Sequence, residues 1–412
     1  MSLLRAFDFN AQVKKFNQVV ENKISTFITA EKFFNAVYSI ALKNPNAKFE
    51  IVSLESDFIK FGSDITMALT KAGVEYSVFL IDTDDVNFEK PEEVFAIKNC
   101  EIIVLGGKDF ISYARFYASN TNGDCHALLT EPYVEGLLGN KVTVPDGGFF
   151  KSITVSPLKT LVLDKDVISK ASGNKIAYAY IKSIGKLIAL IEYKLSILCG
   201  AKQMDKVHYD RARLLVTLLS QINTFKKPIE IIAYCSLTAS QILASSNVLS
   251  CAGNEKIAHA IELINKDFIK CDVAMTAFIK TAKLYHAFFT NDLTDLPSVA
   301  DYNGDISLLC KISGKDKEYF YSLLKIPSKE RKKLLAKLIN LTRADFLKET
   351  SVIISMLDGV QKTFLALKKT NESLSTIKYP IVKESLKLAP YLTSEVTVLS
   401  LCRDFGVINL AK

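Results

Sequence analysis

The sequence is poor in several features that would assign it to a special class of protein. Glycine and proline are scarce, with 17 and 10 among 412 residues, and 49% of the residues are hydrophobic. This composition excludes collagen-like order and general disorder. The eight cysteines are scattered without a Cys-x-x-Cys pair, so we expect reduced thiols instead of a disulfide framework.

Long apolar runs and a large excess of one charge are also missing. The uncharged apolar runs, such as residues 187–191, are too short to cross a bilayer, and the charged opening does not resemble a signal peptide. Lysine and arginine total 52 against 44 acidic residues, a mild excess for this length. We therefore expect a cytoplasmic protein with no membrane or nucleic-acid partner.

The two parts of the chain differ in their periodicity. In the first part, β-branched and aromatic runs at residues 48–54, 75–81 and 101–107 predict buried strands, with helical patterns among them. Because such strand–helix–strand units form parallel sheets, we expect a Rossmann-like α/β domain over residues 1–165. Stripes of helical period then predict an all-helical domain over residues 166–412, and a ligand site between the two domains is the default hypothesis.

The most informative local feature is a pair of glycines between a predicted strand and a helix. Gly106 and Gly107 follow the strand directly, and Lys108 opens the helix. Glycine lets a phosphate approach the backbone, and a helix N-terminus offers unpaired amides and partial positive charge. The turn is therefore either a phosphate-binding site or a tight turn without a ligand.

The same segment carries a family resemblance. It is similar to the Gly-Gly-Gly-x-x-x-Asp-x-Ala-Lys turn of the iron-containing alcohol dehydrogenase and dehydroquinate synthase-like superfamily, in particular of its glycerol-1-phosphate dehydrogenase branch. The matching residues are Gly106, Gly107, Ala114 and Arg115, whereas Lys108 replaces the third glycine and Ser112 replaces the aspartate. Residues 157–168 and 393–407 resemble later motifs of the family in the right order.

The resemblance implies a dehydroquinate synthase-like fold, a homodimer and a small phosphorylated substrate. It places NAD or NADP at the turn, with Gly106, Gly107, Lys108 and Ser112 as the cofactor-binding positions. It also implies a divalent metal, such as zinc or iron, held by one aspartate and two histidines, which would polarise the substrate hydroxyl.

The positions that match these metal ligands are only partly kept. Lys175 stands where the aspartate belongs, His259 matches the first histidine, and Cys271 replaces the second. A lysine ammonium repels a metal ion, so these substitutions argue against a metal site. Glu255, one helical turn before His259, is either a replacement ligand or an ordinary residue of the helix surface.

Other positions stay open. The substrate loop of the family corresponds either to residues 131–136 or to residues 146–149, and the latter also fit a hairpin turn. The acid that contacts the adenosine ribose is Asp82 or Asp84. The three remaining histidines, His126, His208 and His286, show no spacing that signals a site.

Three hypotheses follow. The chain is an NAD(P)-dependent dehydrogenase of a polyol phosphate, or an altered relative that binds a phosphorylated ligand without metal, or an unrelated protein whose glycines mark only a turn. If Lys108 and Lys175 both face the ligand site, lysine cations have replaced the metal cation.

Overall fold

The structure is a computed structural model. It describes residues 6–18, 25–82, 100–119, 123–146, 149–250, 252–291, 302–323, 329–369, 377–392, 397–405 and 407. These residues form two compact units, which we call the sheet unit and the helical unit. The sheet unit lies within residues 1–146, 150–179 and 221–245, and the helical unit comprises the rest.

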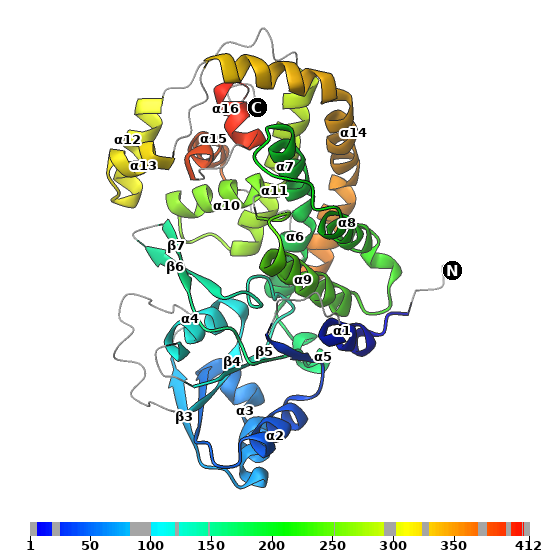
Figure 1. Ribbon diagram of the computed structural model, residues 1–412, viewed down its shortest axis with the longest axis vertical. Helices are drawn as coiled ribbons and strands as arrows, with labels where there is room; N and C mark the ends of the chain where they lie inside the picture. Colours follow the sequence, from blue (N-terminus) through cyan, green and yellow to red (C-terminus); the bar gives the residue numbers. More distant parts are fainter. Residues whose placement is uncertain are drawn as a thin grey trace. The chain divides into compact units, whose positions relative to one another are not determined.

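The sheet unit is built on a parallel sheet of six strands in the order β1-β8-β5-β4-β2-β3 (Figure 1). The strands are β1 (Phe27–Thr29), β2 (Phe49–Leu54), β3 (Tyr76–Ile81), β4 (Glu101–Gly106), β5 (Cys125–Leu129) and β8 (Thr160–Val162). The strands predicted at residues 48–54, 75–81 and 101–107 are therefore confirmed as β2, β3 and β4.

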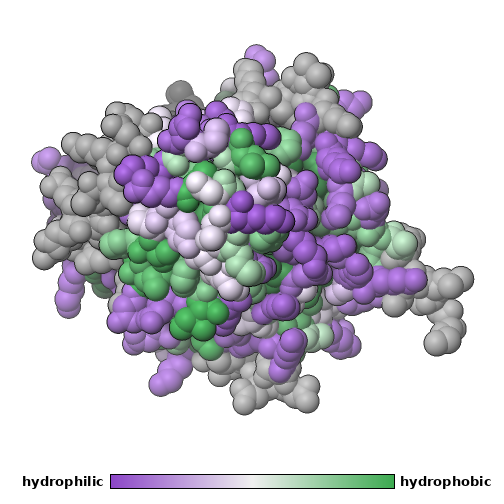
Figure 2. Space-filling model, turned by 90° about the horizontal axis from the view of Figure 1, so that it is seen from below, coloured by the Kyte–Doolittle hydropathy of each residue, from purple (hydrophilic) through white to green (hydrophobic). Residues whose placement is uncertain are grey.

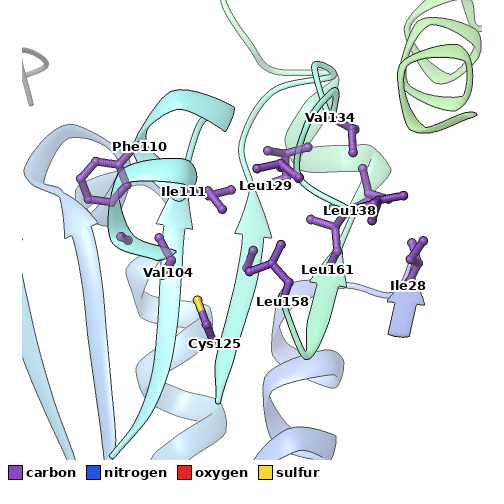
Figure 3. Packing of buried hydrophobic residues seen from close by; sticks show 14 of the residues in the cluster. Ile28, Val104, Phe110, Ile111, Cys125, Leu129, Val134, Leu138, Leu158 and Leu161 are labelled. Carbon is purple, nitrogen blue, oxygen red and sulfur yellow. The ribbon is translucent and has the colours of Figure 1, made fainter. Parts of the chain in front are cut away.

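Both faces of this sheet are covered by helices, and β4 shows how the sequence achieves this. After Glu101 its residues are apolar, and alternate side chains enter different cores. Ile103 and Leu105 pack with helices α2 (Phe33–Lys43) and α3 (Glu55–Ala72). Val104 packs on the opposite side with Phe110 and Ile111 of α4 (Lys108–Ala118), as Figure 3 shows.

Helix α9 (Pro228–Ser245) belongs to the sheet unit although it comes from the predicted helical half. Its Ala233 and Leu237 enter the same core as Val104, together with α1 (Phe9–Gln18). The compact units therefore do not follow the division that the periodicity places at residue 165. A change of period marks where strands stop, whereas packing decides which unit a helix joins.

The helical unit contains no strand among its described residues apart from Phe149. Its helices are the end of α6 (Gly173–Ile184), α7 (Lys186–Leu198), α8 (Lys206–Ser220), α10 (Gly253–Ile264), α11 (Lys270–Thr290), α12 (Tyr302–Ser313), α13 (Lys317–Leu323), α14 (Lys329–Lys368), α15 (Tyr379–Leu388) and α16 (Val398–Asp404). The shorter elements of the chain are β6 (Lys141–Asp146) and β7 (Phe149–Thr154), which pair as a separate two-stranded sheet, α5 (Lys165–Ile168) and two 3₁₀ turns, η1 (Ile222–Thr224) and η2 (Ala389–Leu392).

The described helices, the surface and the cysteines match what the composition predicts. Within the described ranges, no helix combines the length and apolarity that a membrane span requires. Hydrophobic and hydrophilic residues are mixed on the face seen in Figure 2. The cysteines that the structure describes all form unbridged thiols, and Cys251 lies outside the described residues.

Substitution of Ser240 tests the place of α9 in the sheet unit. The Ser240 hydroxyl accepts hydrogen bonds from the amides of Gly136, at 3.1 Å, and Leu138, at 3.3 Å. Ser240→Ala leaves both amides without this acceptor, so we expect a loss of about 1–3 kcal/mol in the free energy of unfolding by urea. Ser245→Ala is the control, since that hydroxyl bonds only to its own helix at Gln241. Equal stability of the two variants would contradict this assignment.

Candidate functional site

The glycine turn is closed by a carboxylate of the chain itself. Gly106 ends β4, and α4 begins at Lys108. The backbone amide of Lys108 donates a hydrogen bond of 2.8 Å to Oε1 of Glu131. A Cβ atom on Gly107 would lie only 2.7 Å from Oε2 of the same carboxylate, so glycine at this position makes room for Glu131. The first amide of the helix is therefore already paired with an anion.

Two lysines and two acids surround this turn. Lys175 Nζ lies 3.6 Å from Glu131 Oε2, and Lys108 Nζ lies 3.1 Å from Asp109 Oδ1. The pKa of the Glu131 carboxyl is raised, because burial, together with the nearby Asp109, outweighs the opposite effects of Lys175, the amide of Lys108 and the Lys108 ammonium.

The loop that follows Glu131 is firmly anchored. Arg115 on α4 is fully buried, and it donates hydrogen bonds to the carbonyls of Leu137 at 3.1 Å, Gly139 at 2.6 Å and Ser156 at 3.2 Å. The amide of Val134 donates to Ser236 Oγ at 2.8 Å. Arg115, which the resemblance places in the cofactor motif, therefore fixes the loop that carries Glu131.

The structure thus brings together part of the predicted set. Gly106, Gly107 and Lys108 form one turn, and Ser112 lies buried on the helix that follows. Lys175, matched to a metal-binding aspartate, contacts Glu131 in the sheet unit. The role of Glu131 was not predicted. Its position just beyond β5, the strand beside β4, is the signal that could have revealed it, because the carboxyl ends of neighbouring parallel strands share an edge.

A second cluster of charges lies in the helical unit around Glu255 of α10. Lys182 Nζ, from α6, lies 3.0 Å from Glu255 Oε1, and Lys186 Nζ, from α7, lies 2.8 Å from the same oxygen. The Lys186 side chain is only 1% exposed. Burial would raise the pKa of Glu255, but Lys182 and Lys186 hold it well below its usual range. One carboxylate therefore faces two ammonium groups.

Two buried polar side chains are next in sequence to members of this cluster, Asn254 to Glu255 and Ser183 to Lys182. Asn254, next to Glu255, is 5% exposed, and its Oδ1 has no hydrogen-bond partner. Its Nδ2 lies 2.6 Å from the place that a Cβ of Gly185 would take. Ser183 is 2% exposed, and its Oγ also lacks a hydrogen-bond partner. Buried polar atoms without a partner are rare, and a ligand or water accounts for many of them.

The two other predicted metal positions lie in different surroundings. His259 is on α10, where burial and the nearby Lys256 lower its pKa to about 4, so the ring is neutral at neutral pH. Cys271 is buried at the start of α11, where burial and Asp272 raise its pKa to about 12. Asp272 is itself held by Lys368 at 2.8 and 2.9 Å.

These donors do not fit zinc or iron. In the part of the chain that the structure describes, no group of three histidine, cysteine or acidic side chains gathers as a metal site would require. Glu255, the replacement ligand considered from the sequence, is bound by two lysines. Lys175, His259 and Cys271 offer an ammonium, a neutral imidazole and a protonated thiol.

The remaining residues that the sequence analysis considered form ordinary structural contacts or lie outside the described residues. Each of the other histidines bonds a neighbouring side chain: His126 to Thr160 and Glu101, His208 to Asp205, and His286 to Thr350. Asp82 is exposed after β3, and Asp84 lies outside the described residues. Residues 146–149 connect the paired strands β6 and β7, as the hairpin alternative required, although Gly147 and Gly148 are not described.

Comparison with known proteins identifies the fold. No family model matches the chain, and no curated protein matches its sequence. Among solved structures, NADH-dependent butanol dehydrogenase A from Thermotoga maritima is 13% identical, with 89% of this chain and 97% of that chain covered and a TM-score of 0.52. The iron-containing alcohol dehydrogenase from Thermococcus thioreducens is 12% identical, with coverages of 94% and 99% and a TM-score of 0.53.

A third structure agrees with these two. The archaeal halo-thermophilic Red Sea brine pool alcohol dehydrogenase ADH/D1 is 12% identical, with coverages of 95% and 98% and a TM-score of 0.55. The predicted fold class, an α/β domain followed by a helical domain, is therefore confirmed. More narrowly, the chain has the dehydroquinate synthase-like fold of the iron-containing alcohol dehydrogenases.

The burial of His259 predicts a specific pH dependence of stability. Its pKa is about 4 in the folded chain against 6.5 for an ordinary histidine, so the unfolded chain binds the proton more readily. The stability that depends on the neutral ring is complete above pH 6.5 and is lost as the pH falls toward 4. We expect the urea midpoint of His259→Gln to fall less than that of the wild type between pH 7 and pH 5 (about the range in which histidines titrate). His208→Gln is the control, and equal pH dependence of wild type and His259→Gln would contradict the assignment.

Proposed function

We propose that this chain uses the fold of the iron-containing alcohol dehydrogenases to bind a small phosphorylated ligand without a metal ion. The observation that carries the proposal is the pairing of Lys182 and Lys186 with one oxygen of Glu255. This pairing lies one helical turn from His259, where the resemblance expects a metal. Two ammonium groups gathered around one carboxylate, beside a neutral imidazole, suit an anionic ligand.

Two buried polar groups that adjoin this cluster in the sequence favour a ligand that also carries hydroxyl groups. Asn254 Oδ1 is an acceptor without a partner, and Ser183 Oγ can donate or accept a hydrogen bond. A polyol phosphate would offer its phosphate oxygens to the ammonium groups and its hydroxyl groups to these two side chains. Glycerol 1-phosphate is the simplest probe of this class.

An NAD(P)-dependent polyol dehydrogenase is the second candidate. It is favoured by the strand–turn–helix at Gly106 and Gly107 and by the names of the similar solved structures, which include an NADH-dependent butanol dehydrogenase. This candidate requires a dinucleotide in the sheet unit and another group in place of the metal. The homodimer that the resemblance implies stays a prediction under both candidates.

Binding of glycerol 1-phosphate tests the first proposal. Isothermal titration of protein dialysed against a chelator should show binding, and Lys182→Met should weaken it. A charge-assisted hydrogen bond contributes about 1.5–3 kcal/mol, so we expect a loss of roughly 10- to 100-fold in affinity. Lys194→Met is the control, since Lys194 lies in the same unit but pairs with Glu349.

Two results would contradict the proposal. One is affinity for glycerol 1-phosphate that appears only after zinc or iron is added. The other is an equal affinity of wild type and Lys182→Met. Formation of NADH or NADPH from glycerol 1-phosphate would establish the second candidate instead.

A further inference from the structure

The glycine turn of the sheet unit leads to an inference that does not depend on the proposed function. We infer that Glu131 is a built-in anion that takes the phosphate position of the β4–α4 turn and excludes a dinucleotide pyrophosphate from it. NAD and NADP, which the resemblance places at this turn, therefore do not fit the residues present there.

The geometry of the α4 N-terminus places Glu131 where a phosphate would bind. A phosphate at such a turn accepts hydrogen bonds from the first amides of the helix and approaches a glycine closely. Glu131 meets both conditions, because Oε1 accepts from the Lys108 amide at 2.8 Å and Oε2 fills the space that the missing side chain of Gly107 leaves. The carboxylate and a phosphate would compete for the same place.

The charged side chains around the turn also disfavour a pyrophosphate. The Glu131 side chain is only 13% exposed, and its second oxygen faces Lys175. The other cation of the turn, Lys108, pairs with Asp109. A pyrophosphate at this turn would thus find both lysines already beside acidic side chains of the chain, and negative charge on Glu131 or Asp109 would repel it.

The loop that carries Glu131 is held in a fixed position. Ser236 and Ser240 of α9 accept hydrogen bonds from the loop amides of Val134, Gly136 and Leu138. Arg115 of α4 donates hydrogen bonds to the backbone carbonyls of Leu137 and Gly139 in the same loop. Because the backbone is held at this many points, Glu131 can leave the turn only by rotation of its side chain, which would give up the cap of α4.

Variants of Glu131 test the inference with ADP-ribose and inorganic pyrophosphate as probes. We expect no binding heat from the wild type with either probe at millimolar concentration (roughly the weak end of specific binding). Glu131→Ala should bind ADP-ribose at least tenfold more tightly than the wild type, and Glu131→Gln, which keeps the shape but not the charge, should lie between them. Glu55→Ala is the control, because it removes an acid from the first turn of another helix of the sheet unit.

The outcomes are distinct. Micromolar binding of ADP-ribose by the wild type would overturn the inference, and so would failure of both Glu131 variants to gain affinity.

Thermal unfolding in the presence of pyrophosphate gives a second measurement: the unfolding temperature should rise with pyrophosphate for Glu131→Ala and Glu131→Gln but not for the wild type. If Glu131→Ala does not fold, Glu131→Gln decides the question alone. Glycerol 1-phosphate should bind all these variants equally, so failure of the proposed function and failure of this inference remain distinguishable.

Discussion

The hydrogen bond between the Lys108 amide and the Glu131 carboxylate is the contact on which the arrangement of the glycine turn depends. A helix N-terminus behind a glycine turn attracts an anion, and in this chain the loop after β5 supplies that anion. Several other features follow from it. Gly107 must lack a side chain, Lys175 balances the buried charge, and Arg115 and α9 hold the loop in position.

Each unit contains a cluster of lysines and acids. In the sheet unit, Lys175 lies beside Glu131 and Lys108 pairs with Asp109. In the helical unit, Lys182 and Lys186 both contact one oxygen of Glu255. Lys186 is almost fully buried, and a buried ammonium is stable only beside an anion, which explains why Glu255 is there.

The sequence predicted the fold better than the site, for physical reasons. Apolar runs such as residues 101–107 determine strands locally, and the step from β4 through two glycines to α4 is visible without a structure. The assignment of α9 to the sheet unit depends on packing, which no periodicity reports. Lys108 and Lys175 both lie near Glu131, which the sequence suggested only as part of a substrate loop, and their role toward a ligand stays a prediction.

The lysine pair was missed for a similar reason. Lys182 and Lys186 are ordinary polar positions on predicted helices, and only the folded chain brings both to Glu255. Glu255 itself was considered as a ligand because it shares a helix face with His259, and the structure shows that its partners are ammonium groups.

A crystal structure of the wild-type protein grown with glycerol 1-phosphate and ADP-ribose together tests most directly whether the two units divide these roles. We expect phosphate density against Lys182 and Lys186, with Glu131 still bonded to the amide of Lys108 and no density at the glycine turn. Density of a pyrophosphate at the N-terminus of α4, with Glu131 turned away, would contradict this account.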